Sequence, residues 1–401
     1  MSNFSFEILH ENGRMRVGRI NTTHGSFETP AFIPVATKAT IKGLTYQEVA
    51  QIGYNYLLCN TYHLWSPIYV IENFGGLHNF MNWPHVIITD SGGYQVFSLG
   101  ARIEHGIGRL NEVYSGISPK RNKKLTEIDD SGVHFIDPKN GEKRFLSPEL
   151  SIEIQEKLGS DIMFVLDECT SPYHHYDYNI DALERTHRWA QVCLDARRSD
   201  NALFGIVQGS IYRDLREQSA KFIGSLPFDG FGIGGVLLYA TEEIPNPRMT
   251  MYDILDWTVP ILPYNKPRHL LGIGDIESIF NCVELGIDTF DCVDPMRIGR
   301  RGNLFLTPGN GGNVANKFRL NIRKNESRMD EKPIDPYCQC PTCLNYTRAY
   351  LNWLYRNEEI AYQILAVQHN LWFMYRLMED IRQSIRKGSF AQLKEKWLGY
   401  Q

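Results

Sequence analysis

Short runs of apolar and β-branched residues recur eight times along the chain. Each run is apolar throughout instead of alternating with polar residues, which is typical of strands buried on both faces of a parallel sheet. Amphipathic stretches with helical spacing separate most of the runs. Eight successive strand–helix units predict an α/β fold of the (β/α)8 TIM-barrel type. The predicted strands are residues 31–35, 54–58, 86–89, 162–166, 203–207, 230–233, 269–271 and 287–290.

Local signals mark the ends of three predicted helices. A short polar side chain before the first turn can accept a hydrogen bond from a free backbone N–H, a proline suits the first turn, and a glycine ends the last one. The signals are Ser147-Pro148 before 150–158, Asn179 or Asp181 before 182–197, and Gly286 after 275–285.

Three regions do not fit a minimal barrel. Residues 5–30 predict a small antiparallel sheet at the bottom of the barrel. Residues 100–145 are polar and rich in turn formers, which indicates an insertion after the third strand. The tail from Leu344 is predicted to be helical, with a break near Asn357. We therefore expect a barrel over residues 1–336, which includes the insertion, and a metal-binding helical subdomain over residues 337–401.

The composition is that of an ordinary globular protein. The 401 residues are 43% hydrophobic and 22% charged. The first twenty residues lack the apolar segment of a secretory signal, and no stretch approaches the 18 apolar residues of a membrane span. We therefore expect a cytoplasmic protein without membrane contact, in which the eight cysteines are not a disulfide framework.

The charge is unevenly distributed. A net charge of −4 argues against general nucleic-acid binding, but Arg297 to Lys332 holds nine Lys and Arg against three Asp and Glu, a balance of +6. A solvated surface loop explains such a run. A local patch that contacts phosphates fits equally well.

Three cysteines and a distant histidine have the spacing of a metal site. Cys338, Cys340 and Cys343 lie within six residues, and twenty-five residues separate the last of them from His369. Three thiolates on one turn and an imidazole from a following helix complete the tetrahedron that Zn²⁺ prefers. With four protein ligands the zinc would be structural. The alternative is a reduced thiol cluster with an unrelated histidine.

Two aspartates stand where an apolar run gives way to a polar loop. Asp90 follows 86–89 and precedes Ser-Gly-Gly-Tyr-Gln, and Asp291 follows 287–290. Barrel enzymes place their chemistry at the carboxyl ends of strands, and two carboxylates facing one cleft suit acid/base or nucleophilic work at a sugar carbon. Helix caps or turn aspartates are the alternative.

Other predicted strands also end in polar groups. Asp167 follows 162–166, Gln208 follows 203–207, and Gly234-Gly235 follows 230–233. A carboxylate, an amide and exposed backbone N–H groups are what is needed to read the edge of a purine-like base. Tyr94 offers a face on which a planar ring can stack.

These motifs together resemble the bacterial-type tRNA-guanine transglycosylases. The resemblance runs nearly from end to end and implies an irregular (β/α)8 barrel with a zinc-binding subdomain near the C-terminus. It also implies exchange of the wobble guanine of GUN-anticodon tRNAs for a 7-deazaguanine base, preQ1 or queuine, in queuosine biosynthesis. The shared motifs are TPAFIPVATKATIKG, NTYHL, DSGGYQVFSL, DIMFVLDEC, FGIVQGS, GIGG, HLLGIGD, FDCVDPMRIGRRG and the Cys₃His site.

The resemblance assigns roles to individual residues. Asp291 would be the nucleophile that attacks the ribose C1′ and forms a covalent enzyme–RNA intermediate, and Asp90 the general acid/base. Two displacements at one carbon give net retention. The base would be bound by Asp167, Gln208, Gly235 and Val236, with Tyr94 stacked on it and Cys169 lining the pocket, and the anticodon loop would be held by Arg297 and Arg300.

An aromatic series follows the cysteine cluster. Tyr346, Tyr350 and Trp353 recur at helical spacing. Core packing is one interpretation. The family resemblance implies a homodimer contact instead.

The chain departs from the family pattern at the predicted base pocket. Enzymes that use preQ1 usually have Leu-Ala-Val-Gly-Glu after Gly-Gly, whereas residues 236–240 here are Val-Leu-Leu-Tyr-Ala, with Glu242 and Glu243 displaced. Either a shifted glutamate serves the aminomethyl group or the pocket takes another base such as queuine. Residues 100–125 also exceed the usual loop length. The rival interpretations are a non-catalytic tRNA-binding partner subunit, an exchange enzyme acting on DNA, and a glycoside hydrolase.

Overall fold

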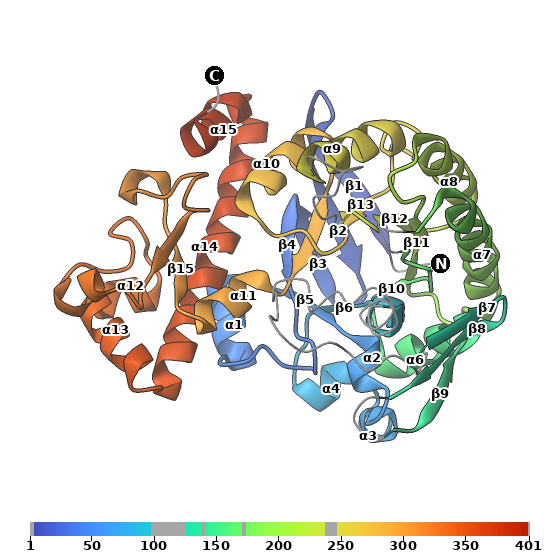
Figure 1. The fold of residues 1–401 in the computed structure, drawn as a ribbon, viewed down its shortest axis with the longest axis horizontal. Helices are drawn as coiled ribbons and strands as arrows, with labels where there is room; N and C mark the ends of the chain where they lie inside the picture. The colour runs from blue at the N-terminus through green and yellow to red at the C-terminus, as the bar shows by residue number, and fades with distance from the viewer. Residues whose placement is uncertain (1–3, 98–125, 138–140, 171–173, 237–246, 400–401) are drawn as a thin grey trace. The chain divides into compact units, whose positions relative to one another are not determined.

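The computed structural model describes residues 4–97, 126–137, 141–170, 174–236 and 247–399 (Figure 1). Eight strands form one sheet, in the order β4-β14-β13-β12-β11-β10-β6-β5, and Val35, directly after β4, forms a parallel bridge with Leu58 in β5. All eight predicted strands and the barrel fold class are thereby confirmed. The strands are β4 (Ala31–Pro34), β5 (Tyr56–Cys59), β6 (Val86–Thr89), β10 (Ile162–Phe164), β11 (Ala202–Val207), β12 (Gly230–Ile233), β13 (Arg268–Leu270) and β14 (Thr289–Cys292).

The remaining strands form three antiparallel sheets. The first confirms the small N-terminal sheet, the second lies within the predicted insertion and extends one residue beyond it, and the third is a hairpin. Part of the predicted insertion, residues 100–125 and 138–140, lies outside the described residues. The sheets are β1 (Ser5–Asn12), β2 (Met15–Thr22) and β3 (Gly25–Thr29); β7 (Thr126–Asp129), β8 (Gly132–Ile136) and β9 (Lys143–Leu146); and β15 (Asn303–Phe305) with β16 (Arg319–Asn321).

The helices largely follow the predicted signals. Ser147 caps α6 by accepting a hydrogen bond from the N–H of Leu150 at 3.2 Å, and Asp275 caps α10 in the same way. The helices are α1 (Tyr46–Ile52), α2 (Thr61–Leu64), α3 (Ile68–Asn73), α4 (Leu77–Met81), α6 (Pro148–Leu158), α7 (Tyr176–Ala196), α8 (Arg213–Ser225), α9 (Pro247–Thr258), α10 (Ile276–Glu284), α11 (Asp294–Arg300), α12 (Pro341–Asn345), α13 (Arg348–Arg356), α14 (Ile360–Arg386) and α15 (Phe390–Leu398).

The predicted start of α7 is wrong. The helix begins at Tyr176 with His175 as its N-cap, so Asn179 lies within the first turn. The Asn179 side chain is buried and donates hydrogen bonds to the carbonyls of His174 and His175. An asparagine that serves the preceding turn gives the same local sequence signal as a true cap, because both satisfy backbone groups at a helix start.

The described chain divides into two compact units, which we consider separately. The first unit lies within residues 59–80 and 87–266, and the second within residues 4–58, 81–86 and 267–401. In the first unit, α7 and α8 pack side by side on the outside of β11 (Figure 1). The core between the strands is apolar, with Phe164 and Phe204 in edge-to-face contact at 5.5 Å.

In the second unit, a buried ion pair joins the N-terminal sheet to β14. Arg16 in β2 donates two hydrogen bonds to Asp288, which directly precedes β14, and both side chains are almost fully buried. The N-terminal sheet therefore contacts the amino end of β14, opposite the end that bears Asp291. The 27-residue helix α14 runs beside β15 and α12 (Figure 1).

Candidate active site

Asp90 is held as a hydrogen-bond acceptor at the end of β6. Its Oδ1 accepts from the backbone N–H of Thr61 at 2.9 Å and of Gly92 at 3.2 Å, and its Oδ2 accepts from Asn60. Asn60 is also the N-cap of α2, because its Oδ1 accepts from the N–H of His63. The start of α2 therefore orients the carboxylate through Asn60 and Thr61, and the Gly92 N–H adds a hydrogen bond from the turn that follows Asp90.

The loop after Asp90 packs closely on the end of β10. Gly92 has a φ of +80°, which glycine adopts without strain. A Cβ on Gly93 would lie 2.8 Å from the Leu166 side chain and 3.3 Å from the Asp167 carbonyl oxygen. The next residue, Tyr94, keeps 39% of its surface exposed. A glycine at position 93 is thus required for this loop to lie beside Asp167.

Asp167 and Gln208 form a buried hydrogen-bonded pair. Gln208 Nε2 donates to Asp167 Oδ2 at 2.6 Å, and both residues are at least 94% buried. Burial raises the pKa of Asp167 from 3.8 to about 6, against the lowering effect of the Gln208 hydrogen bond. Burial, together with the neighbouring Asp167 charge, also raises the pKa of Cys169 to about 12, so this thiol is neutral.

The Gln208 amide lies against two glycines at the end of β12. A Cβ on Gly234 would lie 2.5 Å from Gln208 Nε2, and a Cβ on Gly235 would lie 2.5 Å from Gln208 Oε1. Gly235 has a φ of +66°, and Val236 beside it is buried. The first unit therefore gathers Asp167, Gln208 and the Gly234–Val236 backbone, as the sequence predicts.

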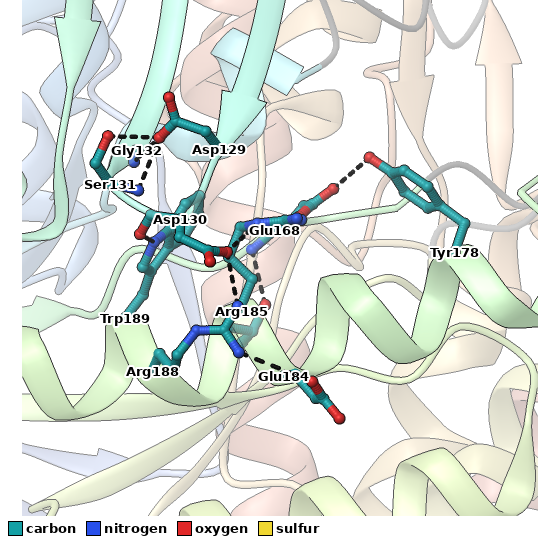
Figure 2. A network of polar contacts seen from close by, with 11 residues as sticks. Asp129, Asp130, Ser131, Gly132, Glu168, Tyr178, Glu184, Arg185, Arg188 and Trp189 are labelled. Carbon is teal, nitrogen blue, oxygen red and sulfur yellow. Dashed lines mark hydrogen bonds and ion pairs between the residues drawn. The ribbon is translucent and has the colours of Figure 1, made fainter.

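A further acidic residue in this region, Glu168, is fixed by α7 (Figure 2). Its carboxylate pairs with Arg185 and accepts a hydrogen bond from the Tyr178 hydroxyl at 2.6 Å. Its backbone N–H donates to Thr186 Oγ1 at 3.0 Å. Three residues of one helix thus hold the segment that carries Asp167.

The same helix binds the turn between β7 and β8. Arg185 and Arg188 both contact the Asp130 carboxylate, at 3.3 and 2.7 Å, and Trp189 donates from its indole N–H to the Asp130 carbonyl at 2.8 Å (Figure 2). Arg185 therefore lies between Asp130 and Glu168. Sequence reasoning missed this network, because its members are up to 59 residues apart.

In the second unit, Asp291 is the next-to-last residue of β14, and its carboxylate is contacted by residues of β13 and of the loop after it. Its Oδ1 accepts from the Gly272 N–H at 2.9 Å and contacts His269 Nε2 at 3.1 Å. His269 is 1% exposed, and its Nδ1 contacts Thr289 Oγ1 at 2.9 Å. His269 therefore links Thr289 to the Asp291 carboxylate, which can accept a hydrogen bond from an imidazole N–H. In the sequence, His269 is visible as a polar residue within a run that is predicted to be a buried strand.

The predicted metal ligands come together in the second unit. The sulfurs of Cys338, Cys340 and Cys343 lie 3.8, 3.5 and 3.3 Å from His369 Nδ1. All four ligand atoms lie within 4.8 Å of one another. His369 Nε2 contacts the carbonyl of Phe305 at 2.8 Å, which leaves Nδ1 to face the sulfurs. This set of donors could hold a metal ion, and the alternative of an unrelated histidine is wrong.

Three arginines gather at the end of α11. Arg297 is partly exposed and pairs with Asp294 at 3.3 Å. Burial, together with the nearby charges of Arg297 and Arg301, lowers the pKa of Arg300. Three of the nine basic residues in the predicted positive segment therefore lie together at the end of this helix.

The aromatic series is exposed. Tyr346, Tyr350 and Trp353 have exposed fractions of 37%, 44% and 56%, and their rings stack in sequence with centroids 5.6 and 6.4 Å apart. The interpretation as core packing is therefore wrong.

In the described residues, no helix is long and apolar enough to cross a membrane.

Known proteins resemble this chain along almost its whole length. The sequence profile of the family described as queuine tRNA-ribosyltransferase matches residues 11–400. A putative queuine tRNA-ribosyltransferase of Archaeoglobus fulgidus is 50% identical over 406 residues, covering 98% of this chain and 99% of the relative. The queuine tRNA-ribosyltransferases of Herpetosiphon aurantiacus and Bacillus subtilis are each 42% identical, covering 99% and 95% of this chain and 93% and 91% of the relatives. The chain belongs to the queuine tRNA-ribosyltransferase family.

Proposed function

We propose that this protein is a tRNA-guanine transglycosylase, a pentosyltransferase. It exchanges the wobble guanine of tRNAs with GUN anticodons for a 7-deazaguanine base, preQ1 or queuine, and so acts in queuosine biosynthesis. Family membership over residues 11–400 is the observation that carries this proposal. The presence of an aspartate at each of two strand ends supports it, since a subunit without chemistry has no need of both.

Asp291 is the proposed nucleophile. One carboxylate oxygen forms a bond to the ribose C1′ while the bond from C1′ to guanine N9 breaks and its electron pair leaves with the base. Both hydrogen bonds of Asp291 within the described residues fall on Oδ1, which leaves Oδ2 to attack. His269 and Gly272 thereby orient the nucleophile without blocking it.

Asp90 is the proposed general acid/base. It protonates the departing guanine and then removes a proton from the incoming base, which attacks C1′ and displaces Asp291. Two displacements at one carbon give net retention. The hydrogen bonds from Thr61 and Gly92 support this role, because they fix the direction of the carboxylate before either proton transfer.

The base is proposed to bind at Asp167, Gln208, Gly235 and Val236. Guanine and 7-deazaguanine offer two N–H groups on one edge and a carbonyl beside them. A carboxylate accepts from the N–H groups, and backbone N–H groups donate to the carbonyl. Tyr94 stacks on the ring and Cys169 lines the pocket as a neutral thiol. Glu242 and Glu243, which bear on preQ1 recognition, lie outside the described residues.

The second unit supplies the proposed contacts to RNA, metal and partner. Arg297 and Arg300 hold the anticodon loop, so binding weakens as salt increases. The Cys₃His cluster holds a structural Zn²⁺, because four protein donors leave no position for water. Tyr346, Tyr350 and Trp353 form a homodimer contact, consistent with their exposure. We expect the protein to act in the cytoplasm.

The test is exchange of labelled guanine into a tRNA with a GUN anticodon, comparing the wild type with Asp291→Asn. Unlabelled preQ1 and queuine are added as separate competitors. We expect exchange by the wild type alone, and the base that displaces the label is the substrate. Absence of exchange by folded, zinc-loaded wild type would favour the alternative, a non-catalytic tRNA-binding partner subunit.

A further inference from the structure

Arg216 in α8 is a fully buried cation without a carboxylate partner among the described residues. Its exposed fraction is 0%, and within the described residues its guanidinium donates to backbone carbonyls only. Burial lowers its pKa to about 10, which still leaves it charged at neutral pH. Burying a charge is costly unless hydrogen bonds compensate for the lost water. Apolar packing therefore does not explain why an arginine occupies this buried position.

The four hydrogen bonds join the ends of two adjacent strands. Nε donates to the Ser210 carbonyl at 2.7 Å and Nη1 to the Val207 carbonyl at 3.2 Å, both at the end of β11. Nη1 also donates to the Gly234 carbonyl at 2.8 Å, and Nη2 to the Gly235 carbonyl at 3.2 Å, both after β12. These are the two segments that carry Gln208 and the Gly234–Val236 backbone.

The contacts determine the direction of two backbone donors. In a planar trans peptide the C=O and the following N–H point in opposite directions. Because Arg216 binds the Gly234 and Gly235 carbonyls, the N–H groups of Gly235 and Val236 point away from it. Neither N–H donates to another residue in the part of the chain that the structure describes. Both remain available to an acceptor on a ligand.

We propose that Arg216 is a positioning residue that aims the Gly235 and Val236 N–H groups at the 6-carbonyl oxygen of the bound base. This inference rests on the proposed function and adds a residue to its base site. Arg216 does not touch the base. It sets which functional group of the base is recognised, because it presents donors where a purine without the 6-oxygen has no acceptor.

Arginine is suited to this task and lysine is not. The guanidinium presents five N–H groups in a rigid plane, which lets one side chain bind four carbonyls from two strands. A lysine has three donors on one nitrogen and cannot span them. The backbone after β12 lies close to the guanidinium, since a Cβ on Gly235 would lie 3.2 Å from Nη2.

The test compares Arg216→Lys with Arg213→Lys, a control one turn earlier in α8. Arg213 is exposed and pairs with Glu217. We measure KM for guanine and for tRNA, and the inhibition constants of hypoxanthine and 2-aminopurine against guanine incorporation. Hypoxanthine keeps the 6-oxygen and 2-aminopurine lacks it.

For Arg216→Lys we expect guanine KM and the hypoxanthine inhibition constant to rise about tenfold, the size of one misdirected hydrogen bond. The 2-aminopurine inhibition constant and KM for tRNA should change less than about twofold, and Arg213→Lys should match the wild type. An equal loss for all three bases and tRNA, or no loss, overturns the inference. Guanine incorporation by the wild type keeps either result separate from a failure of the proposed function, which would be absence of wild-type exchange.

If Arg216→Lys does not fold, Gly235→Ala provides the second variant. Its methyl group would lie 2.5 Å from Gln208 Oε1 and 3.2 Å from Arg216 Nη2, so it displaces the same peptide in a protein that still contains the buried arginine. The expected result is again a loss confined to bases with a 6-oxygen. Wild-type constants in Gly235→Ala would overturn the inference.

Discussion

Replacing Asp167 by asparagine should stabilise the protein while it impairs base binding. The raised pKa means that ionised Asp167 is less stable in the folded state than in water. Asparagine has nearly the same shape and can still accept the hydrogen bond from Gln208 Nε2 through its Oδ1. The variant therefore removes the cost of burying a charge and keeps the buried contact.

The size of the effect follows from the pKa and depends on pH. Below about pH 3.8 the carboxyl is protonated in both the folded and unfolded states, so burial carries no charge penalty. Between about 3.8 and 6 the folded state retains the proton that the unfolded state has lost, and stability falls as pH rises. Above about 6 the full penalty of about 3 kcal/mol applies. At about pH 4.5 it is only about 1 kcal/mol.

The assay is urea unfolding of the wild type and Asp167→Asn from about pH 4.5 to 7.5, followed by both tryptophan fluorescence and circular dichroism. Coincidence of the two transitions justifies a two-state free energy. The advantage of Asp167→Asn should grow by about 2 kcal/mol across this range. Asp195→Asn, at an exposed position of α7, reports the effect of net charge alone. A difference that does not change with pH, or that shrinks as pH rises, would refute the reasoning.

Three further predictions follow from single contacts. Arg185→Met should lower the free energy of unfolding by about 3 kcal/mol, because it leaves the buried Glu168 carboxylate without its ion pair. Arg188→Met should lower it by less than about 1 kcal/mol, because its partner Asp130 is exposed. Urea titration measures both losses, and equal losses would contradict the argument. Zinc removal by a chelator should lower the melting temperature and readdition should restore it, an unchanged melting curve being the contrary result. Trp353→Ala should shift the protein from dimer to monomer at micromolar concentration in size-exclusion light scattering, and a wild-type monomer would remove the dimer proposal.

Much of the candidate site follows from short-range sequence patterns. A strand buried on both faces must be apolar throughout, so the residue at which such a run ends is visible without a structure, and Asp90, Asp167 and Gln208 follow directly from this rule. Close spacing made the cysteine cluster equally visible. The resemblance to a family added roles that the patterns alone left open.

The aromatic series and α7 show where local patterns fail. Helical spacing of Tyr350 and Trp353 is the same whether the stripe faces a core or solvent, and only the packing around α13 decided that it is exposed. A polar residue near a helix start looks like a cap, but in α7 the buried Asn179 serves the turn before the helix. In both cases the surrounding structure, and not the residue type, selected the outcome.

The sequence by itself determined the order of strands and helices, the positions of the strand-end carboxylates and the four metal donors, because each depends on periodicity or close spacing. Only the tertiary structure decided which distant groups support them. His269 meets Asp291, Arg185 meets Glu168, and Arg216 binds carbonyls on two strands. These partners are chosen by how parallel strands and their covering helices pack in three dimensions, and a buried charge or donor is stable only where that packing supplies its counterpart.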